Sequence, residues 1–151
     1  MGFSPLGLAV GLAVLAPNLL LMRFPPRVPI PTTPVPRALA WLERIGQAMC
    51  LVVPAITQPG PVVGWWALPV FGGLAGYYAL WGRYLLTGRA GAALYRPSWV
   101  VPVPMALLPV EVFLSTAAWL SNPWIAVAAV VLACGHIPVS AIVARTVRAR
   151  R

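Results

Sequence analysis

The sequence predicts an all-α protein, a polytopic membrane bundle of five transmembrane helices that forms a single domain over residues 1–151. Composition is the first reason. Of the 151 residues, 60% are hydrophobic and 9% are charged, whereas a soluble domain carries roughly 25% charged residues. Segment length is the second. The apolar residues fall into five runs, each near the ~20 residues that cross a bilayer as a helix. The third is the placement of the arginines, described below.

The first run, Pro5–Met22, has no basic residues before it and no small-residue cleavage site after it, so we expect a retained span rather than a signal peptide. The loop that follows, RFPPRVPIPTTPVPR, is rich in proline and is expected to be extended. It would connect the helices along the membrane surface and could also cover the mouth of a pocket. The remaining runs are Ala38–Ile56, Val63–Leu86, Trp99–Leu120 and Trp124–Ala144.

Proline and glycine are the residues that would shape these helices. Each span contains an internal or near-internal proline, which can leave a carbonyl without its helical partner and kink the helix. Kinked helices tend to splay around a cavity, although prolines are also common in membrane helices. Gly72, Gly73 and Gly76 would allow close packing of the third span. The prolines are Pro17, Pro54, Pro69, Pro102, Pro104, Pro109 and Pro138.

All eleven basic residues are arginines, and their positions predict the topology. The segments between the second and third runs and between the fourth and fifth carry no charge. With five spans, ten arginines fall on one side, which by the positive-inside rule is cytoplasmic. The N-terminus is then outside and the C-terminus cytoplasmic. Only Arg44 lies inside a helix. The ten are Arg23, Arg27, Arg37, Arg83, Arg89, Arg96, Arg145, Arg148, Arg150 and Arg151.

The chain has two acidic residues, and both fall within membrane spans. Glu111, in LLPVEVFLS, is predicted near mid-bilayer with no cation at its depth. A carboxyl group in an apolar setting stays protonated and can donate a proton, so Glu111 is a candidate general acid. The alternative is a structural hydrogen bond to His136 or Asn18.

Glu43 and Gln47, in AWLERIGQ, lie at i and i+4 on one helical face. Glu43 is either a catalytic carboxylate or one half of a structural ion pair. Its expected partner in the second case is Arg83, or Arg44 reaching around the helix.

A third group of side chains would line the interior of the bundle at a similar depth. They are polar or aromatic, and aromatic faces stabilise positive charge. We therefore expect them to bind substrate, with His136 either a packing residue or part of a proton relay. The candidates are Asn18, Gln47, Tyr77, Trp81, Phe113 and His136.

Several classes of protein and site are disfavoured. The arginines are not clustered as in nucleic-acid-binding proteins, and Cys50 and Cys134 lie in apolar segments without a disulfide or metal-binding spacing. No glycine-rich phosphate loop is present. We expect no metal and no cofactor, and the partners would be the lipid bilayer and a hydrophobic small molecule.

With its small all-helical chain, two membrane carboxylates and the segments AWLERIGQ and YYALWGRY, the sequence resembles the small integral-membrane terpene cyclases of bacteria. The resemblance implies a multi-pass protein of the bacterial plasma membrane. It also implies a metal-independent, proton-initiated cyclisation of a farnesyl or similar chain, possible substrates being prenylated indoles and other meroterpenoid precursors. Glu111 would be the acid, or Glu43 with the roles exchanged.

Two other classes stay open. A small proton-coupled transporter would also place carboxylates and a histidine within the membrane. A non-catalytic membrane subunit or assembly protein would need only the bundle and its ion pair. The sequence also leaves open a homo-oligomer, which could supply the inverted repeat that five spans lack.

Overall fold

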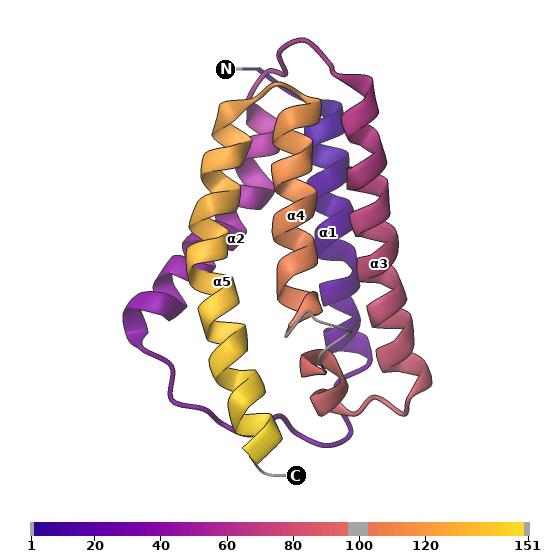
Figure 1. Cartoon of the computed structure of the whole chain (residues 1–151), viewed down its shortest axis with the longest axis vertical. Helices are drawn as coiled ribbons and strands as arrows, with labels where there is room; N and C mark the ends of the chain where they lie inside the picture. The colour runs from indigo at the N-terminus through magenta and orange to yellow at the C-terminus, as the bar shows by residue number, and fades with distance from the viewer. Residues whose placement is uncertain (1, 97–102, 150–151) are drawn as a thin grey trace.

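The computed structural model describes residues 2–96 and 103–149, and within them the chain is helical throughout its regular structure. Figure 1 shows the helices running along the long axis of the molecule, with the N-terminus at one end and the C-terminus at the other. The predicted all-α bundle is thus confirmed for this part of the chain. The α-helices are α1 (Pro5–Arg23), α2 (Arg37–Ile56), α3 (Ala67–Leu86), α4 (Pro104–Trp119) and α5 (Pro123–Ala149), and the short 3-10 helices are η1 (Gly64–Trp66) and η2 (Gly91–Tyr95).

Two helices begin later than predicted. The third was expected from Val63, but residues Gly64–Trp66 form η1 and the α-helix starts at Ala67. The fourth starts at Pro104, where a proline is favourable because the first helical turn does not use its backbone N–H. Trp99 and Pro102, which the prediction placed in the fourth span, lie outside the described residues.

Three helices, α1, α2 and α5, are long and apolar enough to cross a membrane. The other two differ from them in length or composition. Helix α3 has 20 residues, but its tyrosines, glycines and Arg83 lower its hydropathy. Helix α4 has 16 residues and is therefore about 24 Å long at 1.5 Å per residue, less than the ~30 Å of a bilayer's hydrocarbon core.

Small residues determine how closely the helices pack. The most extensive contact joins α2 to α5, and a Cβ atom on Gly46 or Gly135 would collide with the backbone of the opposite helix. In α3 the expected close packing holds at Gly73, where a side chain would meet Glu111 and Val112 of α4. Gly72 has open space beside it and plays no such part.

The prolines do not interrupt the helices. Pro17, Pro54, Pro109 and Pro138 each lie inside a helix that continues past them. Pro17, Pro54 and Pro109 are buried against neighbouring elements.

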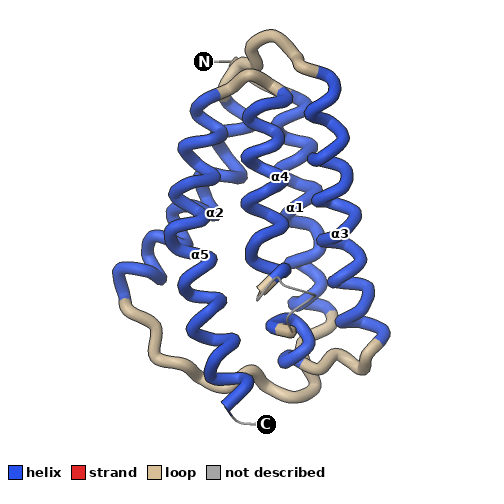
Figure 2. Tube along the Cα trace, viewed as in Figure 1, coloured by secondary structure: helices blue, strands red, loops and turns tan. Residues whose placement is uncertain are grey.

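The two ends of the bundle differ in charge. Figure 2 shows residues 24–36, the connection after α3 and the C-terminal end of α5 together at one end, and residues 57–63 with the α4–α5 turn at the other. The first end carries the arginines of these segments and the second carries no charged side chain among the described residues. We call them the basic end and the neutral end. Arg150 and Arg151 lie outside the described residues.

The proline-rich connection at the basic end is packed against the connection that follows α3. Arg27 donates a backbone hydrogen bond to the carbonyl of Arg89 (3.1 Å), Val28 pairs with Ala90 in a single parallel bridge, and the side chain of Ile30 lies over Gly91. The predicted extended connector along the surface is thus present as an ordered segment.

Large apolar side chains cover the outside of the helices, as expected of a surface in contact with lipid. Leu12 and Leu19 of α1, Val52 of α2, Phe71 of α3 and Val130 of α5 are all exposed. Within the described residues, every α-helix exposes at least one large apolar side chain.

Candidate functional site

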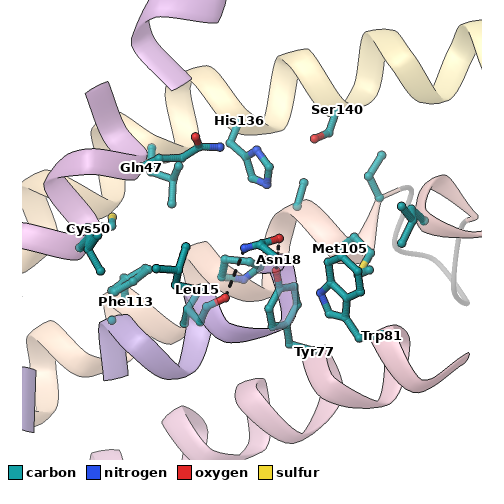
Figure 3. A pocket seen from close by; sticks show the side chains of 18 of the residues that line it. Leu15, Asn18, Gln47, Cys50, Tyr77, Trp81, Met105, Phe113, His136 and Ser140 are labelled. Carbon is teal, nitrogen blue, oxygen red and sulfur yellow. Dashed lines mark hydrogen bonds between the residues drawn. The ribbon is translucent and has the colours of Figure 1, made fainter. Parts of the chain in front are cut away.

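A cavity of about 600 Å³ lies between the helices. All five α-helices and η2 contribute to its wall, and Figure 3 shows the side chains converging on it. Most of the wall is apolar, and the polar groups are few. The polar and aromatic lining residues, together with Cys50, are Asn18, Arg44, Gln47, Tyr77, Trp81, Tyr95, Phe113, His136 and Ser140.

All six residues that the sequence nominated for substrate binding lie on this wall. They come from five different helices, so the bundle brings together residues as far apart as Asn18 and His136. That they share one cavity agrees with the common depth predicted for them; their role in binding stays a prediction.

The central polar contact of the site joins α5 to α2. His136 Nδ1 lies 2.6 Å from Glu43 Oε1, and both side chains are largely buried, with 23% and 18% of their surfaces exposed. Whichever group carries it, one proton lies between the two atoms. His136 also lines the cavity, so the pair can deliver or accept a proton at the wall.

The glycine contacts of α2 and α5 explain this short distance. The backbone of Gly135 lies directly against the backbone of Glu43, and Gly46 lies against Leu132 one turn away. Because neither glycine has a side chain, the helices approach closely at the level of the pair. His136, the residue after Gly135, then reaches Glu43 across the interface.

The prediction that Arg83 or Arg44 pairs with Glu43 is wrong. Among the described residues its salt bridge is with His136, and neither Arg44 nor Arg83 forms one with it. Arg44 points away around the helix, as 100° per residue requires, and its guanidinium lies 5.6 Å from the ring centre of Trp41 while also lining the cavity. Arg83, on α3, keeps a buried Nε atom without a hydrogen-bond partner in the described part of the chain.

Glu111 does not line the cavity. Pro109 and Phe113 of α4 do, and Glu111 lies roughly half a helical turn around from both. Its carboxylate instead packs against Gly73 of α3. Ser115 donates a hydrogen bond to Oε1 (2.8 Å), in place of the expected contact with His136 or Asn18. The other oxygen, Oε2, is buried and has no hydrogen-bond partner among the described residues.

The wall formed by α1 and α3 carries a chain of hydrogen bonds. The Tyr77 hydroxyl donates to Asn18 Oδ1 (3.1 Å), and Asn18 Nδ2 donates to the carbonyl of Val14 (3.3 Å). Trp81, one turn from Tyr77, is almost fully buried, with its ring perpendicular to that of Tyr77 at 6.3 Å between centres.

The wall also includes three residues with polar or reactive side chains that were not predicted to line it. Ser140 lies one turn from His136 on the same face of α5, and this i, i+4 spacing could have identified it. Cys50 was interpreted as a core residue and is buried on the wall. Tyr95 belongs to η2, and nothing in its local sequence indicates that this short segment contributes to the cavity wall.

Tyr95 also lies within electrostatic range of the pair. Burial raises the pKa of the Tyr95 hydroxyl above its usual value of 10.0, and the negative charge of Glu43 adds to the same effect. Within the described residues, no three His, Cys, Asp or Glu side chains are grouped as metal ligands would be.

Comparison with known protein families, with curated proteins and with solved structures found no match to this chain. The resemblance to membrane terpene cyclases is therefore tested by no relative. What the site can do has to be argued from its own residues.

Proposed function

We propose that the protein is an enzyme of the bacterial plasma membrane that cyclises a prenyl chain by proton transfer, with its basic end in the cytoplasm and all five helices within the membrane. The single observation that supports this most strongly is the His136–Glu43 contact of 2.6 Å at the wall of a cavity between the helices. The structure leads us to exchange the roles of the two glutamates: Glu43, through His136, supplies the proton.

The volume and the mostly apolar lining of the cavity support a hydrophobic substrate. Its volume of about 600 Å³ falls within the ~300–1,000 Å³ typical of small-molecule sites. Phe113, Tyr77 and Trp81 offer aromatic surfaces to a positive charge that develops on carbon. The apolar remainder of the wall would keep out the water that quenches such a cation.

A proton shared in this contact suits an epoxide better than an unactivated alkene, because the strained ring opens when its oxygen is protonated. The proton held between His136 and Glu43 passes to the epoxide oxygen as the C–O bond at the more substituted carbon breaks, leaving a hydroxyl group. A π electron pair of the chain then forms the new C–C bond. The last cation loses a proton from the neighbouring carbon, forming an alkene, and this proton returns to the pair. The net reaction is an isomerisation.

The test is to incubate membranes that contain the full chain with a prenylated indole and with its terminal epoxide, and to look for cyclised product by mass spectrometry and NMR. Glu43→Gln and His136→Asn should each lower the rate at least ~100-fold, since general acid–base catalysis contributes about 10²–10⁴-fold. Glu111→Gln is the matched control and should leave the rate unchanged, because Glu111 lies outside the cavity wall.

Each outcome has a definite meaning, provided that the variants are present in equal amounts and monodisperse in detergent. Full activity in both Glu43→Gln and Glu111→Gln would reject the mechanism. Loss confined to Glu111→Gln would reverse the exchange of roles proposed above. No product from either compound with the unmodified chain would reject the proposed activity for this substrate class.

A second candidate function rests on the same contact. A titratable pair that joins two helices able to span a membrane is also what a proton-coupled transporter uses. Uptake of a hydrophobic solute by proteoliposomes that depends on a pH gradient and is abolished in Glu43→Gln, without chemical change to the solute, would favour transport over cyclisation.

A further inference from the structure

Trp81 presents an unsatisfied hydrogen-bond donor at the cavity. Its side chain lines the wall and is only 4% exposed, yet its indole Nε1–H makes no hydrogen bond with any described residue. Buried N–H groups in native proteins nearly always have a partner, which can be a water molecule or a ligand. An oxygen atom of a bound molecule would therefore provide the hydrogen-bond acceptor that this N–H lacks.

The neighbouring hydroxyl group has the opposite need. The Tyr77 O–H is already directed at Asn18 Oδ1 (3.1 Å), so Tyr77 has no hydrogen left to donate and its oxygen can only accept. The two side chains are adjacent, and Figure 3 shows the indole nitrogen of Trp81 on the side of its ring that faces Tyr77. The Trp81 N–H is near enough to interact with the Tyr77 oxygen. The contact falls outside hydrogen-bond geometry, however, and leaves the N–H unsatisfied.

A free donor beside a free acceptor is complementary to one neutral group in particular. We propose that Trp81 and Tyr77 form a subsite for a hydroxyl group of the substrate, which accepts a hydrogen bond from Trp81 Nε1–H and donates one to the Tyr77 oxygen. An ether or ketone oxygen satisfies only the donor. The direction of the Tyr77–Asn18–Val14 chain of hydrogen bonds is what fixes this preference.

The position of the subsite indicates how it would orient a substrate. It lies on the α1–α3 wall, across the cavity from His136 on α5 (Figure 3). This inference rests on the proposed function in that the cavity takes a hydrophobic chain: a hydroxyl held at Trp81 would anchor one part of the chain while another part meets the His136–Glu43 pair. Trp81 is thus a positioning residue rather than a catalytic one.

The experiment measures binding, not turnover. The full chain in lipid nanodiscs is equilibrated by dialysis with farnesol, with its methyl ether and with farnesene, and uptake by empty nanodiscs is subtracted. Farnesol should bind roughly 5- to 150-fold more tightly than farnesene, the range that two net hydrogen bonds provide. The methyl ether should lie between them.

Two variants and a control test the roles of Trp81 and Tyr77 in binding the hydroxyl group. Trp81→Phe should reduce farnesol binding to the level of farnesene, and Tyr77→Phe should reduce it to that of the methyl ether. Both should keep the affinity for farnesene, which shows that the cavity is intact. Trp124→Phe, at an exposed tryptophan at the start of α5, should keep the full preference for farnesol.

Equal binding of farnesol and farnesene, a preference that survives in Trp81→Phe, or no binding of either compound would overturn the subsite. The two proposals can fail separately. A preference for farnesol without cyclised product would reject the enzyme activity and keep the subsite, whereas cyclised product without the preference would do the reverse.

Discussion

Tyr95 is the residue through which pH should act on the basic end of the bundle. It lies partly buried in η2 near Glu43, and its pKa is raised, mainly by burial and then by the charge of Glu43. The folded state therefore holds the phenolic proton more tightly than the unfolded state. Between pH 10 and the raised pKa, unfolding releases a proton, so stability falls as pH rises through this window.

We predict that Tyr95→Phe weakens this dependence on pH. Phenylalanine cannot ionise, so the loss of stability between pH 8 and pH 11 should be smaller in the variant, while the two proteins should be similarly stable near pH 8. The measurement is the temperature at which half of the detergent-solubilised protein loses its monodisperse elution peak. An equally steep decline in the variant would exclude Tyr95 as the responsible group.

The outcome for Glu43 shows the limit of sequence reasoning at the scale of residues. Periodicity and the topology give the depth of a side chain along its helix, and the six lining residues predicted from depth do share one cavity. The local sequence of a helix does not show which other helix packs against it. His136 lies 93 positions from Glu43, and the sequence favours Arg83 or Arg44 as partners of Glu43 because they are expected at a similar depth. It also places Glu111 in the interior of the bundle, although the helical phase of α4 turns this residue away from the cavity.

At the scale of elements, the α2–α5 contact determines the geometry of the His136–Glu43 pair. Gly46 and Gly135 permit the backbones to touch at the level of Glu43 and His136. A side chain at either position would push the helices apart and lengthen the hydrogen bond between the pair.

We predict that Gly46→Ala and Gly135→Ala each destabilise the bundle by ~1–3 kcal/mol, the usual cost of inserting atoms into a packed interior. Gly72→Ala is the matched control, because its Cβ would meet open space and alanine is the better helix former. Thermal unfolding in detergent measures all three. Equal stability of Gly46→Ala and Gly72→Ala would contradict close packing at this interface.

The helices themselves were largely predictable, since five apolar runs of suitable length gave five helices. Their starts were less so. Val63 and Trp99 continue the apolar runs by composition, but the η1 turn and Pro104 set where α3 and α4 begin. Hydropathy records which residues avoid water and does not record where the backbone changes direction.

For the molecule as a whole, the separation of charge between the two ends predicts its orientation. The arginine-rich connections and the end of α5 lie together at the basic end, away from the uncharged turns (Figure 2). By the positive-inside rule, this separation predicts that the basic end of the proposed membrane bundle is cytoplasmic.

We predict that a cysteine at position 59 is labelled from outside intact cells by a membrane-impermeant maleimide, and that one at position 32 is labelled only after permeabilisation. The substitutions are Pro59→Cys and Thr32→Cys, both at exposed loop positions, made in a Cys134→Ser background because Cys134 is exposed and Cys50 is buried. The reverse pattern of labelling would invert the orientation, and labelling of both sites from outside would exclude the five-span arrangement.

The turns of the neutral end are cross-linked by hydrogen bonds between segments far apart in the chain. Gly60 and Val63 donate backbone hydrogen bonds to Leu120 (2.8 Å) and Trp119 (2.9 Å), and the Asn122 side chain donates to Thr57 Oγ1 (2.8 Å). These bonds hold the ends of neighbouring helices together. For the proposed function, we therefore expect that a bulky substrate does not enter between the helix ends on this side of the bundle.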